Sequence, residues 1–301
     1  MGAFASLVRR TPLVAWPGRA DFYLKLENLQ RTGSFKLRGA CLRLDALSED
    51  ERKRGVVAAS AGNHGLGVAL AGQVLGIAVE VIIPGTTPAV KRDGIAALGA
   101  RVSVGGAGYD EAEAEARRLA AATDRVFVSP FDDPLIMRGN GGTVAEEILA
   151  AAPDVTQVVC PVGGGGLISG LAEVLAPRGV AVVGVQPEAN CAMHTSLALG
   201  RALVVYEGRP TLAEGCEGGV SESTYAICRR HGVVTAVVGE DAIRRAMGAA
   251  YRAGHLVEPT AAVALAGVLE RAAPRSPRTV VVVTGGNVNP ELTSRVILES
   301  G

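Results

Sequence analysis

Short apolar runs alternate with helical patterns along most of the chain, and this alternation constrains the fold more than any other feature. Runs rich in β-branched and small apolar residues at 55–59, 78–83, 157–161 and 279–283 indicate buried strands. Helical spacing of apolar residues follows or precedes each run, as at residues 37–47. Strands that alternate with helices form parallel sheets with crossover helices, and ligands bind beyond the carboxyl ends of such strands. The sequence therefore predicts an α/β protein built on parallel sheets.

The chain has 301 residues, which is too long for one small core and fits two domains. One series of strands and helices ends near residue 131, and a second follows it. Residues 11–40 have the character of a ligand site rather than of the first series. We therefore expect a larger domain of residues 1–52 and 132–301 and a smaller, inserted domain of residues 53–131. Within the larger domain, we expect residues 187–225 to be irregular because they are rich in glycine and lack periodicity.

Composition excludes several classes of protein. Thirty basic residues balance thirty acidic ones, so no strong field would attract nucleic acid or an acidic membrane surface. The five cysteines include no CxxC pair, which indicates reduced thiols rather than a disulfide framework or a zinc site. The N-terminus lacks a signal-peptide pattern, and polar residues interrupt the most apolar window, 65–83. We expect a cytoplasmic protein with no membrane or nucleic-acid partner.

A lysine, Lys36, stands at the start of the predicted helix after an alternating segment at residues 22–27. The simplest interpretation is a solvated surface lysine. A lysine flanked by Phe35 and Leu37 and opposed by the helix dipole can instead have a lowered pKa and form a Schiff base with an aldehyde cofactor. The stretch alone favours the surface lysine.

Four consecutive glycines, Gly163 to Gly166, lie between a predicted strand and a predicted helix. Glycines leave backbone N–H groups uncovered, and the positive end of the following helix favours an anion. The loop lacks the Lys-Ser/Thr of a Walker loop and the spacing of a dinucleotide fingerprint. It is therefore predicted to bind a phosphate group.

Two further loops follow strands. The segment from Ser60 to Gly65 reads SAGNHG and could bind a carboxylate, although a helix cap by Ser60 or Asn63 explains it equally well. Thr284 begins the segment TGGN, which by itself is most simply a tight turn.

Together and in this order, the loops resemble those of the fold-type II pyridoxal-phosphate (PLP) enzymes, and most closely the serine/threonine dehydratase and serine racemase branch. The matching segments are KLENLQRTGSFKLRGA at 25–40, SAGNHG at 60–65, FDDPLIMRGNGGTVAEEIL at 131–149, VGGGGLISG at 162–170, EPTAAVALAGVL at 258–269 and TGGNV at 284–288. The resemblance implies two parallel-sheet, three-layer domains of the tryptophan synthase β type. The larger domain would bind PLP, and the smaller would carry the loop for the substrate carboxylate.

The resemblance also implies a role for individual residues. Lys36 would be the Schiff-base lysine and the base that removes the α-proton. The other implied cofactor contacts are Asn63 at the ring hydroxyl, Gly163, Gly164, Gly165, Gly166 and Leu167 at the phosphate, Glu258 near the ring and Thr284 at the ring nitrogen. The implied substrate contacts are Ser60, Ala61, Gly62, Asn63, His64 and Phe131.

The implied reaction is the loss of water and then ammonia from a threonine- or serine-type amino acid, which gives a 2-keto acid. A cofactor ring whose nitrogen faces a hydroxyl is a weaker electron sink than one whose nitrogen faces a carboxylate, and this favours prompt β-elimination.

Three departures from the branch bear on specificity. Racemases carry serine where this chain has Ala61, so we expect little racemisation. The places where metal-binding members carry carboxylates correspond to Gln186 and Ala192, so we expect no metal there, although Glu188 and Glu214 are nearby acids. Arg138 is either a surface charge or a partner for an acidic substrate.

The alternatives are therefore a 3-hydroxyaspartate or phenylserine dehydratase, a serine racemase-like enzyme, a cysteine synthase-like transferase and, in another class, a non-catalytic binder of a phosphorylated ligand. A homodimer is the default expectation for the assembly.

Overall fold

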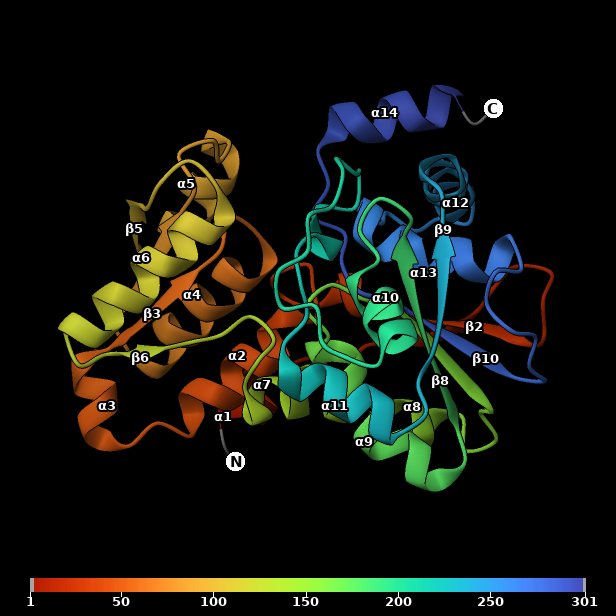
Figure 1. The fold of residues 1–301 in the computed structure, drawn as a ribbon, viewed down its shortest axis with the longest axis horizontal. Helices are drawn as coiled ribbons and strands as arrows, with labels where there is room; N and C mark the ends of the chain where they lie inside the picture. Colours follow the sequence, from red (N-terminus) through yellow and green to blue (C-terminus); the bar gives the residue numbers. More distant parts are fainter. Residues whose placement is uncertain (1–2, 300–301) are drawn as a thin grey trace. The chain divides into compact units, whose positions relative to one another are not determined.

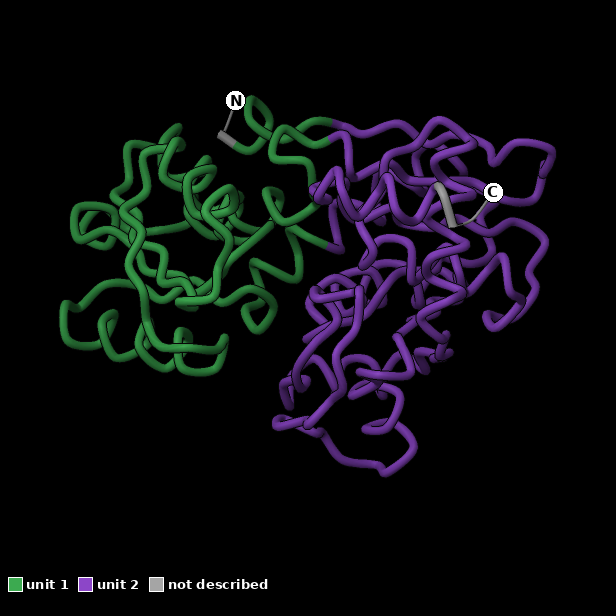
Figure 2. Tube along the Cα trace, turned by 90° about the horizontal axis from the view of Figure 1, so that it is seen from above, with its two compact units in different colours: residues 1–9, 30–140 green, residues 10–29, 141–301 purple. Residues whose placement is uncertain are grey.

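The computed structural model describes residues 3–299 of the chain. These residues divide into two compact units, shown in different colours in Figure 2. Unit 1 comprises residues 1–9 and 30–140, and unit 2 comprises residues 10–29 and 141–301. Each unit has its own sheet, which confirms the α/β class with parallel sheets.

The sheet of unit 1 has four parallel strands in the order β5-β4-β3-β6. Its central strands are buried along their whole length because helices cover both faces, and Glu80 of β4 is their one charged residue. The strands are β3 (Val56–Ala59), β4 (Val79–Ile83), β5 (Arg101–Val104) and β6 (Val126–Phe127).

Alternate residues of these strands point into two separate cores. Ala58 and Val81 pack in the cluster that contains Leu37 and Val68, whereas Ala59 and Ile82 pack against the alanines of one amphipathic helix. Unit 1 is therefore a three-layer structure (Figure 1). Its helices are α1 (Ala3–Leu7), α2 (Lys36–Asp45), α3 (Glu49–Arg54), α4 (Asn63–Leu75), α5 (Ala89–Ala97), α6 (Tyr109–Ala122) and α7 (Pro134–Met137).

The sheet of unit 2 has six strands in the order β1-β2-β10-β7-β8-β9. The edge strand β1 runs antiparallel to β2, and the remaining neighbours are parallel. The strands are β1 (Leu13–Ala15), β2 (Phe22–Leu26), β7 (Gln157–Pro161), β8 (Ala181–Pro187), β9 (Val234–Val238) and β10 (Thr279–Val283).

Helices cover both faces of this sheet as well. Ile168 of α9 lies against Gly184, whereas Gly267 of α13 lies against Val185, the next residue of β8. Successive strand residues point to opposite faces, so α9 and α13 lie on opposite sides of the sheet. The helices are α8 (Thr143–Ala151), α9 (Gly166–Leu175), α10 (Ala192–Leu199), α11 (Glu222–Arg230), α12 (Glu240–Arg252), α13 (Pro259–Leu269) and α14 (Pro290–Glu299).

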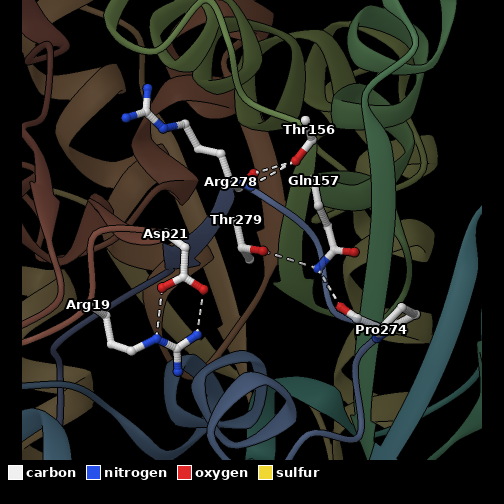
Figure 3. Close-up of polar contacts among 7 residues, drawn as sticks. All are labelled: Arg19, Asp21, Thr156, Gln157, Pro274, Arg278 and Thr279. Atoms are coloured by element: carbon white, nitrogen blue, oxygen red, sulfur yellow. Dashed lines mark hydrogen bonds and ion pairs between the residues drawn. The ribbon is translucent and has the colours of Figure 1, made fainter.

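Polar contacts fix the amino ends of the central strands of unit 2 (Figure 3). Thr156 Oγ1 donates to the carbonyl oxygen of Arg278 over 3.0 Å and accepts from the Arg278 N–H over 2.9 Å. Gln157 Nε2 donates to the carbonyl oxygen of Pro274 over 3.0 Å. These bonds satisfy buried and half-buried polar groups at the edge of the sheet opposite the glycine loop.

The units differ from the expected domain boundaries. Residues 30–52 and 132–140 belong to unit 1 rather than to the larger unit, because α2 packs its apolar face on α4 and α7. Residues 187–225 were expected to be irregular, and this expectation was wrong for α10, which ends at Gly200 in a left-handed conformation. No helix was expected at residues 290–299, where α14 packs on α12.

None of the helices formed by residues 3–299 has the length and apolar character that crossing a lipid bilayer requires.

Candidate cofactor and substrate sites

Lys36 is the first residue of α2, and its ammonium group reaches the loop that follows β6. Its Nζ donates a hydrogen bond to the carbonyl oxygen of Pro130 over 2.8 Å. The same Nζ lies 5.3 Å from the centre of the Phe35 ring. The side chain is half-buried, and both contacts that position its amine come from its own unit.

Helix α4 approaches the backbone of α2 closely at Gly67. A Cβ added at Gly67 would lie 3.1 Å from the Leu37 nitrogen and 3.1 Å from the Lys36 carbonyl carbon. Glycine at this position therefore lets the two helices pack closely enough to support the start of α2.

The loop from Ser60 to Asn63 connects the carboxyl end of β3 to the amino end of α4. The Gly62 N–H donates to Ser60 Oγ over 3.1 Å, and Asn63 begins the helix. No side chain caps the first turn at Gly62. The helix is thirteen residues long, so its first N–H groups and its dipole favour an anion at this end.

His64 is buried, and its ring bonds to the protein backbone. Nε2 lies 2.9 Å from the carbonyl oxygen of Val128, which can only accept, so Nε2 carries the hydrogen. Burial, together with the nearby Lys36 charge, lowers the pKa of His64 to about 3, although the bond to Val128 opposes this shift. His64 is therefore neutral at physiological pH, and its ring joins the loops after β3 and β6.

Ala61 and Phe131 lie on these same two loops. β3 and β6 are parallel neighbours, with Val57 opposite Phe127, so the loops that follow them meet at one edge of the sheet. Both side chains are half-buried. Unit 1 thus brings together Lys36, the loop from Ser60 to His64 and Phe131.

One residue that the sequence did not single out supports α2. Asn140 is buried, and its Oδ1 accepts a hydrogen bond from the Gly39 N–H over 2.9 Å. It lies in the π-helix of residues 138–142, where one turn is widened. The unusual RGNGG sequence was the available signal. It does not reveal the partner of Asn140, because Gly39 lies 101 residues away along the chain.

In unit 2, the four glycines connect β7 to α9, as the sequence predicted. Gly165 precedes the helix in a left-handed conformation, with φ of 97°, and Gly166 and Leu167 form its buried first turn. A Cβ at Gly163 would collide with the carbonyl oxygen of Gly215. Glycine at positions 163 and 165 therefore has a steric reason.

Thr284 follows β10, the parallel neighbour of β7, so it lies at the same edge of the sheet as the glycine loop. The residue is 1% exposed, and its Oγ1 has no hydrogen-bond partner within residues 3–299. Beside it, the Glu258 N–H donates to the carbonyl oxygen of Gly285 over 3.0 Å, and the Glu258 carboxylate lies against Gly285. An unpaired buried hydroxyl at this edge of the sheet indicates a place for a polar ligand.

Gln186, one of the two positions where a metal ligand was considered, has both polar atoms of its amide group hydrogen-bonded to the protein backbone. Its Nε2 donates to the carbonyl oxygen of Val162 over 3.1 Å, and its Oε1 accepts from the His194 N–H over 2.8 Å. Ala192, the other position, is buried. In the part of the chain that the structure describes, His, Cys, Asp and Glu form no group of three that could hold a metal ion.

Comparison with known proteins identifies the family. The model of the pyridoxal-phosphate dependent enzyme family matches residues 5–285. The chain belongs to this family. The fold-type II resemblance, the α/β fold and the PLP cofactor that the sequence predicted are thereby confirmed. Membership also argues against the alternative of a non-catalytic phosphate-ligand binder.

Individual members of this family are similar along nearly the whole chain. The L-threonine ammonia-lyase of Thermotoga maritima is 42% identical over 281 residues, which cover 92% of this chain and 70% of that protein. The processed form of threonine deaminase isoform 2 from Solanum lycopersicum superposes with a TM-score of 0.91 at 34% identity, covering 98% of this chain and 84% of that one. Maize serine racemase has a TM-score of 0.90 at 28% identity, covering 98% and 94%.

Proposed function

We propose that this PLP-dependent enzyme is a dehydratase, or ammonia-lyase, that acts on a β-hydroxy amino acid of the threonine or serine type. It removes water, and the resulting enamine is then hydrolysed, taking up a water molecule and releasing ammonia and a 2-keto acid. The names of its relatives from Thermotoga maritima and Solanum lycopersicum support a threonine-type substrate.

The observation that carries the proposal is the unpaired, buried hydroxyl of Thr284. A neutral ring nitrogen is an acceptor that this hydroxyl can satisfy without a full proton transfer. In the same unit, the backbone of Gly163 to Gly166 and the first turn of α9 at Leu167 suit a phosphate group. The residues present therefore fit PLP, and Glu258 would lie near its ring.

In this proposal, Lys36 is the amine, and the substrate contacts come from the loops after β3 and β6. Lys36 would form the bond to the cofactor, and Asn63 would contact its ring hydroxyl. The substrate carboxylate binds at the amino end of α4, along Ser60, Ala61, Gly62 and the backbone of His64, because N–H groups there lack partners within the helix. Phe131 borders the substrate from the loop after β6.

When bound, PLP withdraws electrons from the α-carbon of the amino acid, and this acidifies its α-hydrogen. Lys36 Nζ is the base that would accept that proton. The Thr284 hydroxyl would donate a hydrogen bond to the ring nitrogen but not a full proton. This would limit electron withdrawal by the ring and favour prompt loss of the β-hydroxyl. The neutral His64 ring, bonded to Val128, contributes position rather than proton transfer.

Ala61 favours dehydration over racemisation. Racemisation requires a group that delivers a proton from the face opposite Lys36. The methyl group of Ala61 has no exchangeable proton, so the serine racemase alternative is the weaker one.

We further propose that the enzyme acts in the cytoplasm as a homodimer. All five cysteines are free thiols, which suits a reducing compartment, and closed two-fold dimers are the commonest assembly. Analytical ultracentrifugation of the purified protein tests the dimer, and a monomer would contradict it.

The test of function is release of ammonia and 2-keto acid from L-threonine, L-serine, 3-hydroxyaspartate and phenylserine, compared at equal enzyme concentration. Threonine or serine is expected to give the highest kcat/KM. A preference for 3-hydroxyaspartate would instead assign Arg138 to an acidic substrate side chain. Formation of cysteine from sulfide and an activated serine, without ammonia release, would replace the dehydratase by a transferase.

A further inference from the structure

Helix α11 lies against the glycine loop and contacts it through one buried threonine. Thr224 has no exposed surface, and its Oγ1 donates to the carbonyl oxygen of Gly164 over 2.8 Å. Gly164 is the second of the four glycines, so this bond acts on the middle of the loop and not on the flanking strand or helix. The same hydroxyl lies 3.2 Å from the carbonyl oxygen of Ser221.

The position of Thr224 is itself fixed by the start of its helix. Ser221 is the N-cap of α11, and its Oγ accepts from the Thr224 N–H over 3.2 Å. On the other side, a Cβ added to Gly165 would lie 2.7 Å from Thr224 Cβ. Thr224 is therefore held by its own helix and packed directly against the loop.

The hydrogen bond has a consequence for the loop amides. A peptide unit is planar, so a hydrogen bond that fixes the Gly164 carbonyl also fixes the direction of the following N–H, that of Gly165. Gly165 has a φ of 97°. Without a contact that holds this conformation, a glycine is free to adopt several others. A loop of four glycines loses much conformational entropy when it binds an anion, unless a contact has already ordered it.

We infer that Thr224 is a positioning residue that orders the glycine loop for the cofactor phosphate through its hydrogen bond to Gly164. It does not touch the reacting atoms. The inference rests on the proposed role of the glycine loop as the phosphate site, and none of the sequence motifs pointed to this threonine.

The test compares PLP with pyridoxal, which has the aldehyde and the ring but no phosphate. The full-length chain is stripped of cofactor and titrated with each compound, and binding is followed by the absorbance of the bound cofactor. Thr224→Val removes the hydroxyl and keeps the shape of the side chain. Loss of one buried hydrogen bond is expected to weaken PLP binding by about tenfold. Pyridoxal binding is expected to change less than about twofold, because it does not use the loop.

Two further variants provide controls. Thr224→Ser keeps the hydroxyl and is expected to retain PLP binding close to that of the parent protein. Thr156→Val removes a hydroxyl that also donates to a backbone carbonyl in unit 2, but at the amino end of β7 (Figure 3). It is expected to leave the ratio of PLP to pyridoxal affinity unchanged.

Equal weakening of PLP and pyridoxal in Thr224→Val would overturn the inference, because it would show a general structural role. Unchanged PLP affinity would overturn it as well. If Thr224→Val does not fold, Thr224→Ala replaces it. The ratio of PLP affinity to pyridoxal affinity must then be lower in the alanine variant than in the serine variant. A protein that binds PLP in this way but releases no 2-keto acid would contradict the proposed function and leave this inference standing.

Discussion

The Nζ of Lys36 donates a hydrogen bond to the carbonyl oxygen of Pro130, which lies 94 residues further along the chain. Because Pro130 follows β6, the amine is directed to the carboxyl edge of the sheet of unit 1. Parallel α/β sheets bind their ligands at this edge. The contact thus connects the start of α2 with the loops that carry Ser60 and Phe131.

Replacing Lys36 with alanine is expected to abolish the bond to PLP and the proton transfer at the α-carbon. Loss of a general base lowers rates by about 10²- to 10⁴-fold. The measurements are the visible absorbance of the purified protein and its release of ammonia from threonine. If the Lys36→Ala variant keeps both the absorbance band and full activity, another group forms the bond to PLP and transfers the proton.

Gly67→Ala is expected to lower kcat, because the added methyl group meets the backbone of Lys36 and Leu37 at 3.1 Å. Gly94→Ala is the matched control. It also lies inside a helix, but its methyl group would meet only Leu66 Cδ2, at 3.7 Å. Alanine is favoured over glycine in a helix by about 1 kcal/mol, so the control should gain stability and keep its activity.

Thermal unfolding and steady-state kinetics of both glycine variants check this. If both variants gain the same stability and keep their kcat, α2 moves away from the added methyl group at position 67 without loss of activity, and the prediction is wrong.

The buried His64 makes stability depend on pH. Its pKa is about 6.5 in the unfolded chain and lowered to about 3 in the folded protein, so the unfolded state binds more protons between these values. The contribution of the neutral ring to stability is complete above pH 6.5 and is lost as the pH falls toward 3. The slope amounts to about 1.4 kcal/mol per pH unit for one group.

Urea unfolding between pH 4 and 7 measures this slope. His64→Gln is expected to reduce the slope by the contribution of one proton, about 1.4 kcal/mol per pH unit. An identical slope in the variant and the parent protein would assign the acid sensitivity to other groups.

Thr284→Val is expected to separate stability from cofactor binding. The hydroxyl has no partner within residues 3–299, so replacing it with a methyl group should leave the cofactor-free protein as stable as before or more stable. Binding of PLP should weaken by about 3- to 10-fold through loss of one hydrogen bond. Thr284→Ser should preserve binding. A loss of stability in the valine variant without cofactor would show that the hydroxyl serves the fold.

Ala61→Ser is expected to introduce racemisation, because the serine hydroxyl can deliver a proton that the alanine methyl group cannot. Chiral chromatography of the reaction with L-serine measures the D-serine formed. The parent protein should form little D-serine relative to pyruvate. Abundant D-serine from the parent protein would place the proton donor on another residue.

The sequence by itself determined the features that depend on neighbouring residues. Largely apolar runs predicted β3, β4, β7 and β10, since strands buried on both faces consist mostly of apolar residues. The glycines at 163–166 predicted a strand-to-helix loop because few other structures tolerate four glycines in a row. The combination of these loops also predicted the family and its cofactor.

Only the tertiary structure decided which distant residues meet. It grouped residues 30–52 with unit 1, because the apolar face of α2 matches α4 rather than the larger unit. It paired Asn140 with Gly39 and Thr224 with Gly164, contacts that span 101 and 60 residues. Local sequence specifies the backbone of an element, whereas the partner of a buried polar group is specified by the packing of elements far apart in the chain.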